Sequence, residues 1–132
     1  MMSSEPDLPG LLLGLAYDDL FAARSLLPID GVADSILGFH CQQAVEKSLK
    51  AALAQRQVGY PHTHDLDGLV ELCRTSGLDV PQELDGVEQL APYGVHMRYD
   101  TSRATTLDRE QALRWARSAV AWARSVVETD SI

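Results

Sequence analysis

Apolar residues recur along most of this chain at a spacing of three to four, which is typical of α-helices. The first such stretch predicts a helix over about residues 9–27, ended by Pro28. The second predicts a long helix over about residues 31–57, with Asp30 as its N-cap. No stretch alternates apolar and polar residues over more than a few positions, so we expect no β-sheet.

The second half of the chain predicts three further helical segments. A short helix spans about residues 63–76, with acids in its first turn, where the helix dipole favours them. The next begins at Pro81, and Pro92 is expected to kink or break it. The last has Thr106 as its N-cap and ends near Glu128.

These helices predict an all-α fold, namely an up-and-down four-helix bundle with one additional short helix. A chain of 132 residues that is 45% hydrophobic has the size and composition of one globular domain, which we place at residues 1–132. No apolar run is long enough to span a bilayer and no signal peptide is visible, so we expect a cytoplasmic protein with no membrane partner.

The formal net charge of −8 argues against general DNA binding, which needs dense lysine and arginine. The charge is uneven, because residues 91–124 carry six arginines against three acids. The last helix presents Arg114, Arg117 and Arg124 on one side. These arginines form either a solvated helix face or a local contact for a nucleotide or an acidic partner.

The second helix separates into two faces on a helical wheel. One face carries small and apolar residues suited to close helix packing. The other carries His40, Gln43, Glu46, Lys47 and Lys50, with Phe39 among them. This polar face is either a solvated surface with a Glu46–Lys50 pair, or a site where Gln43, Lys47 and Lys50 converge on an anion such as a phosphate.

The segment FHCQQAVEKSLKAAL at residues 39–53 resembles the second-helix signature of HEPN domains (higher eukaryotes and prokaryotes nucleotide-binding). Three further segments follow in the family's order. PHTHDL at residues 61–66 resembles the family's HDL entry to its third helix, and YGVHMRY at residues 93–99 resembles its Tyr-to-Arg-Tyr segment. The arginine- and alanine-rich last helix is similar to the family's last helix, so the resemblance covers about residues 10–128.

The resemblance implies a bundle of four to five helices, commonly a homodimer, from prokaryotic operons. Many members are partners of a minimal nucleotidyltransferase, including in toxin–antitoxin pairs. Some are metal-independent ribonucleases that need an Arg followed four to six residues later by a His. The corresponding arginine here is Arg98, and the required positions hold Ser102, Arg103 and Ala104. Arg56 and His62 match the spacing but lie elsewhere, so no catalytic residue is assigned and the chain is not expected to be an enzyme.

The predicted nucleotide-binding residues combine the polar face with the family segments. The lysines and Arg98 are expected to contact phosphate, and the other three to orient it or contact the base; the set is Gln43, Lys47, Lys50, His64, Arg98 and Tyr99. No cofactor is expected. His62, His64 and Asp65 could hold zinc only with further ligands, so no metal is assigned, and helix capping is the alternative for His64 and Asp65.

The remaining candidates have structural explanations that need no ligand. Cys41 and Cys73 fit small core residues that stay reduced. Trp115 and Trp122 fit the core or a dimer interface better than base stacking. Three functions therefore stand open: a HEPN-type nucleotide-binding or partner-binding module, a HEPN ribonuclease toxin with a non-standard motif, and a non-catalytic structural bundle. A nucleotide, a short RNA, a minimal nucleotidyltransferase and a second copy of the chain are the expected partners.

Overall fold

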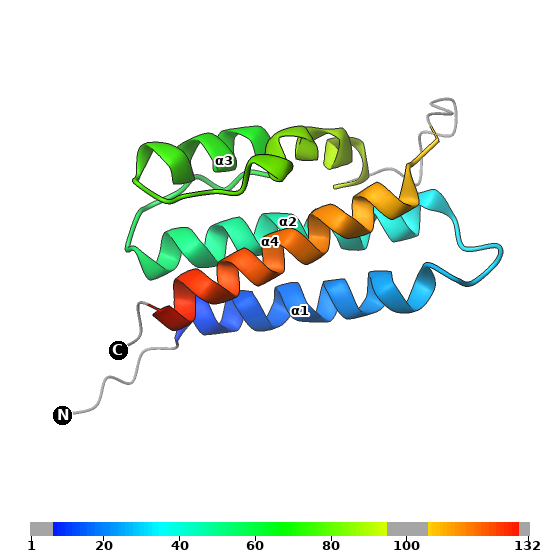
Figure 1. Ribbon diagram of the computed structural model, residues 1–132, viewed down its shortest axis with the longest axis horizontal. Helices are drawn as coiled ribbons and strands as arrows, with labels where there is room; N and C mark the ends of the chain where they lie inside the picture. The colour runs from blue at the N-terminus through cyan, green and yellow to red at the C-terminus, as the bar shows by residue number, and fades with distance from the viewer. Residues whose placement is uncertain (1–6, 95–105, 130–132) are drawn as a thin grey trace.

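The computed structural model describes residues 7–94 and 106–129, and every regular element within them is helical (Figure 1). This confirms the all-α fold predicted from the spacing of apolar residues. The elements in chain order are α1 (Leu8–Leu26), α2 (Asp34–Gln55), α3 (Leu66–Thr75), the 3₁₀-helix η1 (Gln82–Tyr93) and α4 (Arg109–Thr129).

Helix α2 lies at the centre of the molecule and packs against all four other helical elements. Helix α1 and the layer formed by α3 and η1 lie on opposite sides of α2, and α4 runs across α2 between them (Figure 1). Twelve α2 residues are buried, which makes this helix the main contributor to the core. Within the described residues, no helix is both long and apolar enough to cross a membrane.

Two predicted N-caps are wrong, and in both cases a nearby residue takes the position. Gly31 adopts φ 90° and prolongs the turn after α1, so α2 starts at Asp34 rather than beside Asp30. The residue that caps α4 is Asp108, whose Oδ1 accepts a hydrogen bond from the backbone N–H of Gln111 at 3.1 Å.

The fourth segment was expected to be an α-helix interrupted at Pro92, and it is instead a continuous 3₁₀-helix. Its buried residues recur at intervals of three, which is the period of a 3₁₀-helix; they are Leu84, Val87, Leu90 and Tyr93. This spacing keeps one row of side chains facing the core. Pro92 lies within the element without breaking it.

Gly38 in α2 lets the end of η1 approach closely. A Cβ atom built at Gly38 would lie only 2.6 Å from Cγ of Tyr93, so no larger residue fits without movement. The ring of Tyr93 fills this space and is itself 6% exposed. The contact holds the end of η1 against the first half of α2.

Candidate functional site

The polar side of α2 is organised around two acids that lie deeper than the cations they bind. We call the side formed by His40, Gln43, Lys47 and Lys50 of α2, with His64 beside it, the α2 outer face. The chain has only two lysines, and both lie on this face.

The first acid is Asp19, on the side of α1 that packs against α2. Asp19 is 8% exposed, and its Oδ2 accepts a hydrogen bond from Nζ of Lys47 at 2.7 Å. Its Oδ1 lies 2.9 Å from Nδ1 of His40, which is placed to donate the second hydrogen bond. A buried carboxylate needs such partners, because burial without them is costly. Asp19 therefore joins α1 to α2 and fixes Lys47 and His40 in position.

The second acid is Glu46, which is 5% exposed although it belongs to α2's polar side. Its Oε1 lies 2.9 Å from Nε2 of Gln42 and 2.8 Å from Nδ1 of His64, and its Oε2 lies 2.9 Å from Nζ of Lys50. Burial alone raises the pKa of the Glu46 carboxyl, but the hydrogen bonds from Gln42, His64 and Lys50 outweigh it and bring the pKa below its ordinary value. Glu46 is therefore an anion with each carboxylate oxygen occupied.

The charged state of Glu46 determines which ring nitrogen of His64 carries a proton. An ionised carboxylate only accepts hydrogen bonds, so Nδ1 of His64 carries the proton that it donates. In the neutral ring this leaves Nε2 as an acceptor, and the His64 side chain is 54% exposed. His64 thus offers an oriented ring nitrogen to solvent at the edge of the α2 outer face.

Lys50 and Gln43 are also held by neighbouring groups. Nζ of Lys50 lies 5.7 Å from the centre of the Tyr60 ring, a cation–π distance, and its side chain is 14% exposed. Nε2 of Gln43 donates to Oε1 of Gln42 at 2.7 Å, which extends the hydrogen-bond chain that ends at Glu46. These contacts limit the side-chain freedom that would be lost if the face bound a ligand.

The structure brings four of the six predicted binding residues to one face. Gln43, Lys47 and Lys50 follow one another at helical spacing, and His64 adjoins them through Glu46. The predicted Glu46–Lys50 pair is present at 2.9 Å. Arg98 and Tyr99 lie outside the described residues.

Sequence reasoning missed that Asp19 and Gln42 belong to this arrangement. Asp19 interrupts an otherwise apolar row on α1, three residues after Ala16 and four before Ala23, and both of these alanines are fully buried. Gln42 adjoins buried Cys41 and precedes Glu46 by one helical turn. A polar residue within a buried row is the signal that would have found both, and Gln42 also has a complementary residue, Glu46, one turn away.

Capping explains one of the two residues before α3 and not the other. Oδ1 of Asp65 accepts a hydrogen bond from the backbone N–H of Gly68 at 3.1 Å, so Asp65 is the N-cap. His64 makes no such cap and binds Glu46 instead. Within residues 7–94 and 106–129, no three His, Cys, Asp or Glu residues are grouped as a metal site.

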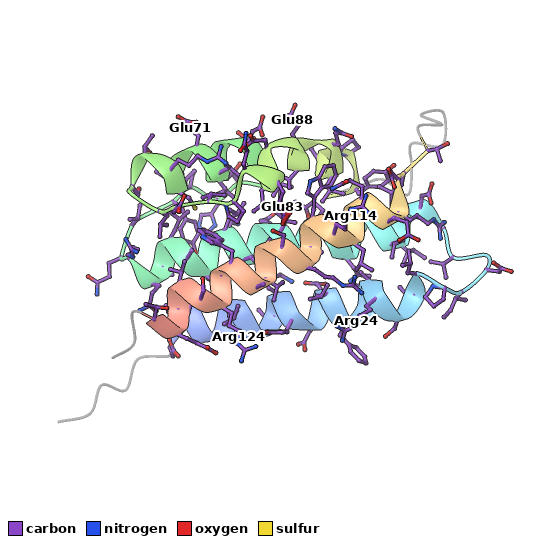
Figure 2. All side chains as sticks on the ribbon, in the orientation of Figure 1. Arg24, Glu71, Glu83, Glu88, Arg114 and Arg124 are labelled. Carbon is purple, nitrogen blue, oxygen red and sulfur yellow. The ribbon has the colours of Figure 1, made fainter. Side chains whose placement is uncertain are left out.

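Three of the four arginines of α4 lie on its exposed side, whereas Arg109 pairs with Asp34. Arg114, Arg117 and Arg124 are all exposed, and Arg124 pairs with Glu128 at 3.0 Å. Figure 2 shows Arg24 and Arg124 along the side of α1 and α4, and Glu71 and Glu88 along the opposite side formed by α3 and η1. The side formed by α3 and η1 is acidic, because Glu71, Glu83 and Glu88 are all exposed there.

Trp115 and both cysteines have structural positions. The side chain of Trp115 is 7% exposed, and its Nε1 donates to the carbonyl oxygen of Glu83 at 2.9 Å, which ties α4 to η1. Cys41 and Cys73 are free and fully buried, and burial raises the pKa of each thiol to about 12. These positions confirm the assignment of all three residues to the core.

The family model for the HEPN domain matches residues 11–126. This range contains α2, α3 and η1 in full, and α1 and α4 except for their outer ends. The chain belongs to the HEPN domain family. Searches of curated proteins and of solved structures found no match. Membership places the chain among nucleotide-binding and ribonuclease-like modules, and the matched range includes Gln42, Glu46 and Lys50.

Proposed function

We propose that this HEPN domain is a nucleotide-binding and partner-binding module that works as a homodimer. Its proposed partner is a minimal nucleotidyltransferase in a prokaryotic toxin–antitoxin-like pair. The observation that carries the binding proposal is the α2 outer face, where both lysines of the chain are fixed by buried acids next to an exposed imidazole. We place the binding site at Gln43, Lys47, Lys50 and His64, and extend it to Arg98 and Tyr99 on the family resemblance.

The balance of charge on this face favours a small ligand over a long polyanion. The ammonium groups of Lys47 and Lys50 are matched by the carboxylates of Asp19 and Glu46, so the cluster has no net charge while the histidines are neutral. A neutral cluster on a chain of net charge −8 attracts a nucleic-acid backbone weakly. Its affinity must come from directed hydrogen bonds, which suits a mononucleotide or a short RNA.

The same face retains donors for such a ligand. Each ammonium group has three N–H bonds, of which one is directed at its carboxylate, and Lys47 is 25% exposed. The ring of His64 binds the same carboxylate as Lys50, and its Nε2 adds an acceptor for a hydroxyl or N–H group of such a ligand. A phosphate bound between Lys47 and Lys50 would therefore meet oriented donors whose positions are already fixed.

Calorimetric titration with a panel of nucleotides and a short RNA tests the binding proposal. We expect micromolar affinity for one ligand, with a loss of at least tenfold in Lys47→Gln, because glutamine keeps a donor for Asp19 but removes the cation. Arg114→Gln is the matched control, since it removes one positive charge from the exposed face of α4. Equal affinity in all three proteins, or no binding by the wild type, contradicts the proposed site.

The two lysines also allow the site to be located directly. Reductive ¹³C-methylation keeps the lysine charge and labels only Lys47, Lys50 and the terminal amine. The ligand is expected to shift both lysine signals in an NMR titration. Unchanged lysine signals in a sample that binds ligand would place the ligand elsewhere.

Recovery from native cells tests the partner proposal separately. Affinity-tagged chain is expected to copurify with a minimal nucleotidyltransferase encoded by a neighbouring gene. If no nucleotidyltransferase is recovered and no neighbouring gene encodes one, the partner proposal fails. The nucleotide site is tested independently by the calorimetric titration.

A HEPN ribonuclease with a non-standard motif is the second candidate, and the orientation of His64 favours it. Glu46 holds the ring through Nδ1 and the side chain is 54% exposed, so Nε2 is left to accept the proton of a ribose 2′-hydroxyl. Metal-free cleavage of RNA that disappears in His64→Asn and persists in His62→Asn would support this activity. Intact RNA, together with normal growth of cells that overproduce the chain, would remove it.

A further inference from the structure

The exposed large apolar side chains of the described residues are confined to the first part of the chain. All of them lie between Leu8 and Phe39, and none lies on α3, η1 or α4. Five are on α1, where Leu11 is 54% exposed and Phe21 is 63% exposed; the others on α1 are Leu8, Leu15 and Tyr17. A solvent-facing helix side of this composition is typical of a contact surface.

These α1 side chains are arranged symmetrically about Ala16. Because each residue advances about 100° around an α-helix, residues equally far before and after Ala16 lie at mirror angles. Ala16 is fully buried, so the direction opposite Ala16 is the outward one. Leu11 pairs in this way with Phe21, and Leu15 pairs with Tyr17. The exposed side of α1 is therefore complementary to itself when a second copy runs antiparallel.

We propose that a second copy of this chain packs against α1 as an antiparallel α1–α1 pair. The pair has its two-fold axis on the side opposite Ala16. This inference rests on the proposed homodimer and adds the surface that forms it. Leu11 of one copy then meets Phe21 of the other, twice by symmetry, as an isologous interface requires.

The charged residues at the ends of α1 fit the same register. Arg24, which lies 6.0 Å from the Phe21 ring centre, falls opposite Leu8 of the second copy and hence beside Asp7, the N-cap. Each Arg24 can therefore reach a carboxylate at the start of the other α1. The antiparallel arrangement also brings the positive end of each helix dipole to the negative end of the other.

Asp18 is the one residue near the axis that opposes the pairing. It falls opposite Gly14, where a Cβ atom would meet nothing within 4 Å, so there is space for its side chain. The two Asp18 side chains of a dimer are offset along the helix axis by about 6 Å, and they repel each other. The dimer is accordingly expected to tighten in Asp18→Asn.

Cysteine crosslinking of the full chain tests the register. Leu11 and Phe21 lie about 15 Å apart along one helix, so a Leu11→Cys/Phe21→Cys variant cannot close a disulfide within one chain. In the proposed dimer the thiol introduced at position 11 of each copy faces the thiol introduced at position 21 of the other. Mild oxidation is therefore expected to give a covalent dimer on a non-reducing gel.

Each single variant alone is the control for this crosslink. In Leu11→Cys the two introduced thiols of a dimer lie about 15 Å apart along the axis, and the same holds for Phe21→Cys, so neither is expected to form the covalent dimer. Cys41 and Cys73 are buried and do not compete.

Light scattering on wild type, Leu11→Glu/Phe21→Glu and the control Ile36→Glu completes the test. Ile36 is 50% exposed but lies on α2. We expect dimers for wild type and Ile36→Glu, and monomers for the α1 variant, with unchanged circular dichroism. If the wild type is a dimer and the Leu11→Glu/Phe21→Glu variant remains one, or if Leu11→Cys/Phe21→Cys forms no covalent dimer, the α1 interface is overturned and the homodimer stands. A monomeric wild type at tens of micromolar overturns both.

Discussion

Nδ1 of His64 lies 2.8 Å from Oε1 of Glu46, a carboxylate that is 5% exposed in the centre of the bundle. The contact joins the entry of α3 to α2, and it connects an exposed ring to a buried charge. Lys50 binds the other oxygen of the same carboxylate. One acid thus stabilises the fold and also sets the positions of two residues of the proposed binding site.

The variant Glu46→Gln keeps the shape of the side chain and removes its negative charge. Glu46→Gln leaves the ammonium of Lys50 without its carboxylate, and we expect a loss of about 1–3 kcal/mol in the free energy of unfolding at pH 7. Urea unfolding measures it. Glu71→Gln on the exposed side of α3 is the control and is expected to change stability by less than about 0.5 kcal/mol.

The same variant has a defined pH dependence. Because the pKa of Glu46 is lower in the folded chain than its ordinary value of 4.5, its ionised form stabilises the fold above that pH. The contribution is lost as the pH falls through the folded pKa. Wild-type stability is therefore expected to decline more steeply than that of Glu46→Gln below pH 4.5. Parallel curves would show that Glu46 does not titrate as its contacts require.

The native cysteines are expected to be inert. Cys41 and Cys73 are fully buried, and their thiol pKa values are raised to about 12 by burial, so almost no thiolate forms at pH 8. A thiol-reactive chromogenic disulfide should label neither residue in the native chain and both in urea. The thiol of an Ile36→Cys variant serves as the positive control, because Ile36 is 50% exposed and lies outside the proposed α1 interface. Rapid native labelling of wild type would indicate that the core opens at Cys41 or Cys73.

Gly38 is predicted to be indispensable for the contact with Tyr93. A methyl group at Gly38 would lie 2.6 Å from the ring, so Gly38→Ala must displace the end of η1, at about 1–3 kcal/mol of stability. Thermal and urea unfolding measure the change. At Gly59 a Cβ atom meets nothing within 4 Å, so Gly59→Ala is expected to be nearly neutral. An equally stable Gly38→Ala would mean that the ring of Tyr93 moves freely.

The spacing of apolar residues was sufficient to predict the helices but not where each one starts. Asp30 and Thr106 are acceptable caps by type, but the N-cap positions belong to Ala33 and Asp108, because tertiary contacts decide where each helix starts. Asp34 accepts hydrogen bonds from the backbone N–H of Leu107 at 3.1 Å and from Nε of Arg109 at 2.6 Å, both at the start of α4. Contacts between residues this far apart in sequence leave no local pattern.

The site was predicted only in part, because some of its contacts also join residues that are far apart in the sequence. Lys47 and Lys50 were found because they share a helix face at local spacing. The Glu46–Lys50 pair was predicted as well, but as part of a solvated face, whereas Glu46 is buried. Asp19 was not identified as the partner of Lys47, because it belongs to another helix. The 3₁₀ geometry of η1 was readable in its apolar spacing of three, but Pro81 and Pro92 suggested an interrupted α-helix.

The Asp34–Arg109 pair is expected to stabilise the bundle more than an exposed pair does. Both side chains are 30% exposed, and Arg109 also donates to the carbonyl oxygen of Val32, so one arginine ties α4 to the segment before α2. Arg109→Gln is expected to cost about 1–2 kcal/mol. In Arg124→Gln the lost pair is 57% and 61% exposed, and little change is expected. Equal effects of the two variants in urea unfolding would contradict this ranking.

Asp19→Asn distinguishes a binding role for Lys47 from a purely structural one. The amide keeps the size of the side chain and removes the charge that neutralises Lys47, so the free energy of unfolding is expected to fall by about 1–3 kcal/mol. The released ammonium then carries an uncompensated charge on the α2 outer face. If Lys47 contacts a phosphate, calorimetry should show tighter nucleotide binding in this less stable variant than in wild type. If Lys47 only joins α2 to α1, the stability falls and the affinity stays the same.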